Sequence, residues 1–248
     1  MESQVKAIQH LIDEGALFVI NHSGGKDSQA MTVIVRTLVP DDQLLVVHAE
    51  LGDVEWDGCE ELIRKTTAGL PLIVCKSVTD FWTMVDRRRM FPSPSNRQCT
   101  SDLKRGPIER EVRRYLKANP QFNGLIVNCM GLRAEESSSR AKLETLKVSA
   151  RNSKAGRNWY EWLPIHDMSE TTVFATIAQA GQEAHWVYAA GMRRKSCAFC
   201  IMACDSDLKR AAELRPKLYA RYVAKERELG FTLSMSRRSL PEITGIAA

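Results

Sequence analysis

The sequence is 248 residues long, 44% hydrophobic and 26% charged, with a formal net charge of +5. These values are ordinary for a globular protein, and no apolar run approaches the roughly 20 residues that a membrane-spanning helix needs. The N-terminus lacks the basic-then-apolar layout of a signal peptide, which predicts a cytoplasmic protein with no membrane partner. In a reducing compartment, seven cysteines suit metal or redox chemistry better than disulfides.

The first part of the chain predicts alternating strands and helices. A helix is expected over 5–12, and apolar runs predict strands at 17–20, 44–48 and 71–75, with helices over 27–38 and 57–68 between them. This order indicates a parallel sheet with right-handed crossovers. Glu50 and Asp53 follow the second strand, at the sheet edge where open α/β sheets bind ligands.

The rest of the chain predicts one more strand and several helices. A helix over 80–90 precedes an irregular loop at 91–95, and an amphipathic helix reaches about Lys117. A strand at 124–129, a mobile polar segment at 147–157 and a short strand or turn at 162–169 follow, with helices over 170–179, 205–214 and 217–229. We predict a doubly wound, mostly parallel α/β sheet of about five strands over 1–190. A helical, cysteine-bearing region over 191–248 completes the chain.

A glycine-rich stretch joins the first strand to the next helix. It comprises Ser23, Gly24, Gly25, Lys26, Asp27 and Ser28. Such a turn presents backbone N–H groups at the positive end of a helix, its glycines let an anion approach, and Lys26 adds a charge. Adjacent glycines distinguish it from the G-x-x-x-x-G-K-[ST] loop. We predict that these six residues bind phosphate groups; the alternative is a plain strand-to-helix turn.

Three cysteines lie close together in the C-terminal region. Cys197 and Cys200 have the two-residue spacing that lets both sulfurs face one ion, and Cys204 follows at the distance of one helical turn. Cys99 is the expected distant partner, because it lies in a loop among basic residues rather than in an apolar stripe. The other three cysteines, Cys59, Cys75 and Cys129, occupy a predicted helix and two strands and are expected in the core.

Basic residues are concentrated in two segments. Residues 86–114 hold nine lysines and arginines against four acids, and residues 133–157 hold seven against three. Such clusters attract phosphate-rich partners, either nucleotide or nucleic acid, and a solvated basic face is the alternative.

Four motifs together resemble the phosphoadenosine phosphosulfate reductase family of the adenine nucleotide α-hydrolase-like superfamily, which includes the ATP pyrophosphatases of DNA phosphorothioation systems. They are the loop at 23–28, called the PP-loop in this superfamily, Arg97-Gln98-Cys99-Thr100-x-x-Leu103-Lys104-x-x-Pro107, the segment at 131–137, and Cys197-x-x-Cys200. The resemblance covers roughly residues 15–230. It implies a Rossmann-like fold, ATP or an adenylyl sulfonucleotide with Mg²⁺ on the loop, and catalytic roles for Lys26, Lys104 and Arg133. It also implies that Cys99, Cys197 and Cys200 hold a [4Fe–4S] cluster.

Two departures from the family pattern bear on the function. Reductases of this family use a cysteine near the C-terminus as nucleophile, and here no cysteine follows Cys204. Cluster-bearing members have a Cys-Cys pair where this chain has Gln98-Cys99. The fourth ligand is then Cys204, another residue or none, and Cys204 is alternatively a reactive thiol at a helix N-terminus. The spacing from Cys200 favours the ligand.

The sequence favours an ATP pyrophosphatase that adenylylates an acceptor for iron–sulfur-dependent sulfur transfer. Nucleic acid is one acceptor that the basic segments suit, and a cysteine desulfurase or another sulfur donor is an expected partner. The alternatives are a phosphoadenylyl or adenylyl sulfate reductase and a non-catalytic nucleotide-binding iron–sulfur sensor. Zinc in place of iron and the oligomeric state stay open.

Overall fold

The computed structural model describes residues 2–247 and divides into two compact units. The first unit comprises Met1–His48, Glu60–Val74 and Glu109–Ala184. The second comprises Ala49–Cys59, Cys75–Ile108 and His185–Ala248. Both units are thus built from segments distant in sequence. The domain boundary predicted after residue 190 stays a prediction.

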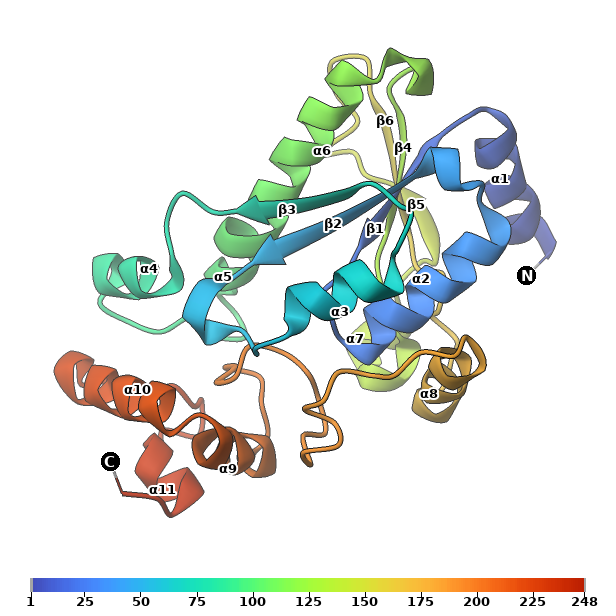
Figure 1. The fold of residues 1–248 in the computed structure, drawn as a ribbon. Helices are drawn as coiled ribbons and strands as arrows, with labels where there is room; N and C mark the ends of the chain where they lie inside the picture. The colour runs from blue at the N-terminus through green and yellow to red at the C-terminus, as the bar shows by residue number, and fades with distance from the viewer. Residues whose placement is uncertain (1, 248) are drawn as a thin grey trace. The chain divides into compact units, whose positions relative to one another are not determined.

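A mostly parallel six-stranded sheet forms the centre of the fold, in the order β3-β2-β1-β4-β6-β5 (Figure 1). The strands are β1 (Leu17–Asn21), β2 (Leu44–Glu50), β3 (Leu72–Lys76), β4 (Leu125–Cys129), β5 (Leu146–Val148) and β6 (Asn158–Trp162). β1 pairs in parallel with β2 and β4, and β4 in parallel with β6, whereas β5 is antiparallel to β6. The α/β class is therefore confirmed.

The sheet has one strand more than predicted. β5 is three residues long, within a segment rich in charged residues, and so has no apolar run. β6 spans Asn158–Trp162 and so begins before the short strand or turn that was predicted over 162–169. Its buried residues Trp159 and Trp162 are three apart, which breaks the alternation that marks a strand in sequence. The sheet of about five strands predicted from the sequence is thus confirmed, with β5 as the additional strand.

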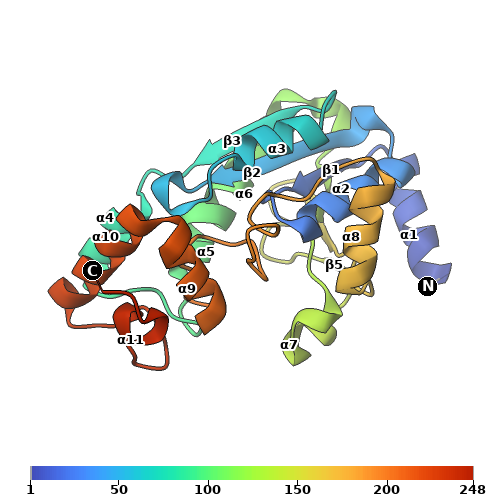
Figure 2. The same ribbon diagram turned by 60° about the horizontal axis from the view of Figure 1, so that its bottom comes forward.

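Helices flank the sheet in the first unit. They are α1 (Glu2–Asp13), α2 (Lys26–Leu38), α3 (Cys59–Thr66), most of α6 (Gly106–Ala118), α7 (Ser138–Ala141) and α8 (Glu170–Gln179). Short 3-10 turns occur at Asp41–Gln43, Pro120–Phe122 and Ala134–Glu136. α2 and α8 lie side by side (Figure 2). Gln29, which is fully buried in α2, donates to Gln182 Oε1 and to the Glu183 carbonyl, each over 3.0 Å.

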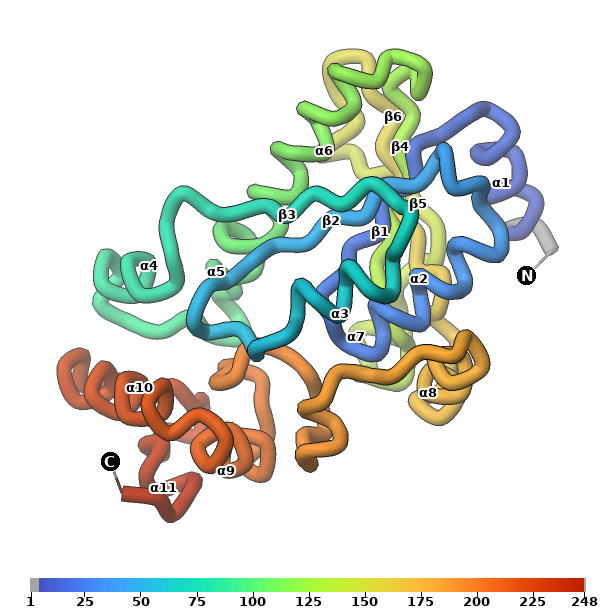
Figure 3. Tube along the Cα trace, viewed as in Figure 1, coloured from blue at the N-terminus to red at the C-terminus, as the bar shows by residue number. Residues whose placement is uncertain are grey.

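The second unit is mainly helical. Its helices are α4 (Phe81–Arg88), α5 (Gln98–Thr100), the π-type turn η3 (Ser101–Arg105), α9 (Asp205–Leu214), α10 (Pro216–Leu229) and α11 (Leu240–Thr244), with a 3-10 turn at Gly52–Val54. α9, α10 and α11 pack together, and the tube in Figure 3 shows the irregular course of 181–204 before them. The predicted cysteine-bearing helical C-terminal part is thus present. Within residues 2–247, no helix is long and apolar enough to cross a membrane.

A buried glutamate holds the chain that follows α10. Glu226 accepts the N–H of Leu233 over 2.7 Å and the N–H of Leu240 over 2.9 Å. Burial nevertheless raises the pKa of its carboxyl, because these two hydrogen bonds do not offset the loss of water. Leu233 and Leu240 are buried, so the segment between them is fixed at both ends.

Candidate functional site

The segment from Ser23 to Ser28 forms a tight loop between β1 and α2. Its backbone turns at Gly24, whose φ of +70° lies in the left-handed region that favours glycine. The Ser23 N–H donates to Ser28 Oγ over 3.1 Å, and the Gly24 N–H donates to His22 Nδ1 over 3.0 Å. The Ser28 hydroxyl in turn donates to the Gly25 carbonyl over 2.9 Å. The side chains of the loop therefore fix its shape.

The start of α2 is the part of this loop that suits an anion. Gly25 is the N-cap residue, in an extended conformation, and no side chain caps the helix. The N–H groups of a first helical turn and the positive end of the helix dipole together favour phosphate. The conformation is thus that of an anion-binding strand-to-helix turn.

Gly131 brings the chain after β4 against the start of α2. A Cβ atom at this position would lie 3.0 Å from the carbonyl carbon and oxygen of Asp27 and 3.1 Å from the nitrogen of Ser28. Because these are backbone atoms that cannot rotate aside, only glycine fits without a shift of the loop. This approach carries Arg133, two residues later, towards Asp27.

Lys26 and Arg133 share the carboxylate of Asp27. Arg133 Nε donates to Asp27 Oδ1 over 2.6 Å, and Lys26 Nζ lies 3.4 Å from Asp27 Oδ2. Lys26 also lies 3.1 Å from Glu170 Oε1. Arg133 donates to Glu135 Oε2 over 2.5 Å. Both cationic side chains are only 4% exposed, so two buried positive charges are balanced here by three carboxylates.

Two groups of this cluster, Arg133 and Glu135, have pKa values that are shifted in favour of their charged forms. Burial disfavours the charged form of Arg133, but hydrogen bonds with Asp27 and Glu135 outweigh burial, and the pKa of Arg133 is raised. The pKa of Glu135 is lowered, first by the N–H of Glu170, which donates to it over 2.8 Å, and then by Arg133. The structure therefore unites two of the residues predicted as catalytic, Lys26 and Arg133, through Asp27.

The third, Lys104, belongs to the second unit, where it lines a cavity of about 30 Å³ together with Cys99, Cys197 and Cys200. The other wall residues are Leu51, Val54, Phe81, Leu103, Phe199 and Ile201. None of the seven cysteines forms a disulfide. Thiols from two segments about a hundred residues apart thus meet in one apolar cavity, with a single lysine among them.

A π-type turn and a backbone contact shape this cavity. After Cys99 the chain passes through η3 into α6 at Gly106, where a Cβ would lie 3.0 Å from the Ser101 carbonyl oxygen. Wide turns of this kind are frequent at functional sites. On the other side, the Ala198 N–H donates to the Val54 carbonyl over 2.9 Å, which fixes the chain between Cys197 and Cys200.

Lys104 supplies the positive charge of the cavity. Burial raises the pKa of the Cys99 and Cys197 thiols, and Lys104 opposes this effect. Cys197 in turn raises the pKa of Lys104, which outweighs the opposing effect of burial. An occupant that binds the cysteines as thiolates would therefore find a counter-charge already present.

Cys204 lies outside the cavity lining. It is exposed, it is the N-cap residue of α9, and its Sγ is 3.1 Å from Ser206 Oγ. The segment from Cys200 to Cys204 forms turns rather than the helical turn assumed from the spacing, so that assumption was wrong. The role of Cys204 as fourth ligand stays a prediction.

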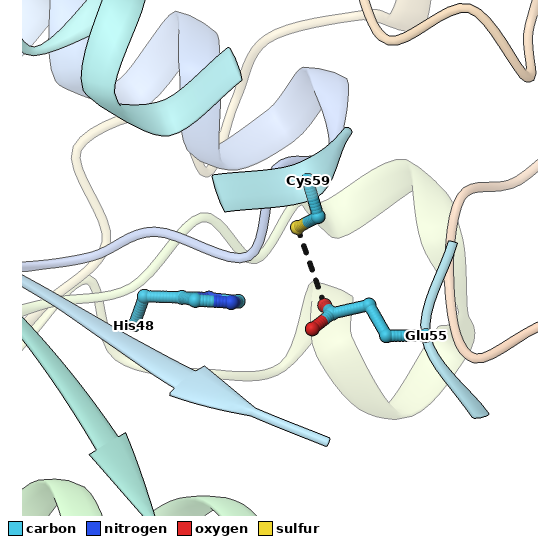
Figure 4. A group of neighbouring side chains, drawn as sticks. All are labelled: His48, Glu55 and Cys59. Carbon is cyan, nitrogen blue, oxygen red and sulfur yellow. Dashed lines mark hydrogen bonds between the residues drawn. The ribbon is translucent and has the colours of Figure 1, made fainter. Parts of the chain in front are cut away.

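The remaining cysteines differ among themselves. Cys75 and Cys129 are buried as predicted, and burial raises the pKa of Cys129. Cys59 is also buried, but its thiol donates to Glu55 Oε1 over 3.2 Å (Figure 4). Lys195 Nζ approaches the same sulfur at 2.9 Å. Cys59 thus has polar neighbours, unlike a simple core residue.

Glu170 is a site residue that the sequence did not identify. It is the first residue of α8, after the N-cap Ser169, whose hydroxyl accepts the N–H of Thr172. A serine followed by an acid is a recognisable helix start. The pattern predicts α8, but it gives no sign that Glu170 contacts Lys26.

The chain is similar to proteins of one known family. The family model of the phosphoadenosine phosphosulfate reductase domain matches residues 18–203. An uncharacterized protein of Methanocaldococcus jannaschii is 26% identical over 211 residues, which are 84% of this chain and 47% of the relative. The chain therefore spans about half the length of this curated relative.

Two solved structures are similar at low identity. Phosphoadenylyl-sulfate reductase from Candida auris, in a phosphate complex, is 14% identical with a TM-score of 0.48, covering 73% of this chain and 81% of that one. FMN adenylyltransferase from Candida glabrata, with FAD and pyrophosphate, is 11% identical with a TM-score of 0.45, covering 71% and 53%. On the match of the family model over 18–203, the chain belongs to the phosphoadenosine phosphosulfate reductase domain family.

Proposed function

We propose that the chain binds ATP on the 23–28 loop and transfers its adenylyl group to an acceptor, which then receives sulfur. The observation that carries this proposal is the cluster in which Lys26 and Arg133 share Asp27 at an uncapped helix start. Two buried cations at one point are costly unless an anion accompanies them. In the structure carboxylates meet this need, and the triphosphate would take their place beside Lys26 while Arg133 keeps its contact with Asp27.

The reaction is an attack on the α-phosphate. An acceptor oxygen forms a bond to the α-phosphorus, the bond to the bridging oxygen breaks, and pyrophosphate leaves. The acceptor hydroxyl loses its proton to solvent, so the products are adenylylated acceptor, pyrophosphate and one proton. Lys26, Arg133 and the first-turn N–H groups hold the phosphates in place and stabilise the charge that develops on them.

The acids beside the loop suit a magnesium ion. Mg²⁺ prefers carboxylate and phosphate oxygens and keeps several waters. Asp27 and Glu170 both contact Lys26, at 3.4 and 3.1 Å, and would be released when Lys26 binds phosphate. These two carboxylates are the residues that we expect to hold Mg²⁺, which would screen the charge of the triphosphate.

For the cysteine cavity we propose a [4Fe–4S] cluster held by Cys99, Cys197 and Cys200. Thiolates suit both zinc and iron–sulfur clusters. The resemblance of the Cys99 and Cys197-x-x-Cys200 motifs to those of cluster-bearing family members favours a cluster over zinc. Such a cluster would supply an iron position open to sulfide.

Lys104 is proposed to balance the charge of that centre and, as the family resemblance implies, to contribute to catalysis. Its pKa is raised chiefly by Cys197, which keeps it cationic beside thiolates.

Cys204, exposed at the start of α9, is proposed as the thiol that carries sulfur to the acceptor. A sulfur donor such as a cysteine desulfurase would then be the partner.

The acceptor is proposed to be a nucleic acid. The second unit holds 19 lysines and arginines against 13 acids, whereas the first unit holds 16 against 17. The whole positive excess thus lies in the unit that carries the cavity cysteines Cys99, Cys197 and Cys200. Concentrated positive charge favours phosphate backbones, with an affinity that falls as salt rises.

A reductase of adenylyl sulfonucleotides is the second candidate, and the family match favours it. Incubation with ATP, Mg²⁺ and a single-stranded nucleic acid as acceptor, followed by pyrophosphate measurement, tests the first proposal. Incubation with a sulfonucleotide and a thiol donor, followed by sulfite measurement, tests the second. Bound nucleotide without either product would instead indicate a nucleotide-binding sensor.

A further inference from the structure

Tyr222 is a fully buried residue whose hydroxyl has no hydrogen-bond partner. It lies in α10 with 0% exposure, and within the part of the chain that the structure describes no group bonds to its Oη. Buried polar atoms are nearly always paired, so an orphan of this kind indicates that an absent group sits beside it. Tyr219, one helical turn earlier, is satisfied: its hydroxyl lies 2.9 Å from Thr244 Oγ1 and donates to the Ile246 carbonyl over 2.6 Å.

The ring of Tyr222 lies behind two walls of the cysteine cavity. Its centroid is 4.9 Å from that of Phe199 and 5.7 Å from that of Phe81, and both phenylalanines line the cavity. The pKa of Tyr222 is raised, mainly by burial and next by Cys197, with Asp53, Cys200 and Cys99 following. All three cavity cysteines are therefore within electrostatic reach of the hydroxyl.

Packing alone does not require this hydroxyl. Tyr222 also contacts the rings of Trp82 at 4.7 Å and Phe91 at 6.1 Å, so its ring is surrounded by aromatic groups. A phenylalanine would fill the same space without leaving a polar atom unpaired. Packing therefore explains why position 222 has an aromatic ring, but it does not explain why the ring carries a hydroxyl.

We propose that the Tyr222 hydroxyl donates a hydrogen bond to the sulfur centre held by Cys99, Cys197 and Cys200, and that Tyr222 is a positioning residue for that centre. This inference rests on the proposed cluster. A phenol O–H is a donor, and thiolate or inorganic sulfide is an acceptor. Hydrogen bonds to cluster sulfurs favour the more negative, reduced state, so this bond raises the reduction potential.

The test compares the full-length protein with Tyr222→Phe and Tyr219→Phe, all prepared anaerobically and reconstituted with iron and sulfide. Circular dichroism checks that each is folded, and a redox titration followed by absorbance gives the midpoint potential. We expect Tyr222→Phe to retain its iron and sulfide but to shift to a more negative potential. Tyr219→Phe, whose hydroxyl already has partners, should keep the wild-type potential.

Two results would overturn the inference, and they are distinguishable. A Tyr222→Phe protein with a full cluster and the wild-type potential would show that the hydroxyl does not reach the centre. If the wild-type protein takes up no iron and sulfide at all, the proposed cluster is refuted, and the inference about Tyr222 is refuted with it.

Discussion

Arg133 Nε and Asp27 Oδ1 lie 2.6 Å apart and join two motifs that are 106 positions apart in the sequence. The bond connects the loop after β4 to the first turn of α2. Only the planar guanidinium can contact Asp27 and Glu135 together in this way, because an ammonium group is a point charge. The 23–28 loop is therefore braced by the segment that follows the neighbouring strand.

The first prediction concerns this brace. Arg133→Lys should destabilise the protein, because the buried guanidinium loses one of its two carboxylate contacts. It should also weaken ATP binding, since the loop loses its support. Thermal unfolding and calorimetric titration with ATP measure the two effects. Arg151→Lys, at an exposed arginine that pairs with Glu109, is the matched control and should change neither. Equal effects of the two substitutions would contradict the brace.

The second prediction separates charge from packing at Lys26. Lys26→Ala should reduce ATP affinity by roughly 30-fold or more, because a charge-assisted contact to phosphate is lost. The fold should persist, since the loop is shaped by Ser28 and His22 rather than by Lys26. Lys154→Ala, at an exposed lysine of the same unit, should leave affinity unchanged. A folded Lys26→Ala protein with wild-type affinity would refute the phosphate-loop assignment.

Sequence patterns predicted those features that depend on a single segment of the chain, such as a strand, a helix or a turn. The alternation of buried strands and helices located β1 to β4 and α2 to α4, and the loop motif located the strand-to-helix turn at 23–28. The contacts of Lys26 with Glu170 and of Tyr222 with the cavity walls depend on chain segments brought together by folding. The short strand β5 lacked an apolar run, so local periodicity carried no signal for it. At Cys204 local spacing was misleading. Cys200 and Cys204 are four residues apart, as on one face of a helix, but the residues between them form turns in the structure.

The third prediction uses the buried histidine of the second unit. Burial, and next the charge of Lys195, lowers the pKa of His185 to about 4 from the ordinary 6.5. Between these values the unfolded chain binds a proton that the folded chain does not, so stability is lost as pH falls from 6.5 towards 4. His185→Gln should lose less stability over this interval. Denaturant unfolding at pH 7 and pH 5 measures the stability of the wild type and of His185→Gln. The same pH dependence in these two proteins would show that His185 does not cause the loss of stability.

The fourth prediction assigns the cysteines. Cys197→Ser and Cys200→Ser should each lose iron and acid-labile sulfide, because a ligand is removed from a three-cysteine site. Cys204→Ser should keep both, since Cys204 lies outside the cavity, but should stop sulfur transfer to the acceptor. Iron, sulfide and zinc analysis of anaerobic preparations measures this. One equivalent of zinc without iron would show a different metal site, and loss of iron in Cys204→Ser would make Cys204 a ligand.

The central claim is that ATP is cleaved at its α-phosphate, and the fate of a label on the γ-phosphate tests it most directly. The protein is incubated with γ-labelled ATP, Mg²⁺ and single-stranded nucleic acid, and the labelled products are separated. Wild type should release the label as pyrophosphate and leave AMP attached to the acceptor, and Lys26→Ala should release little. Label released as inorganic phosphate, with ADP as the other product, would contradict the account, as would intact ATP after incubation with the wild type.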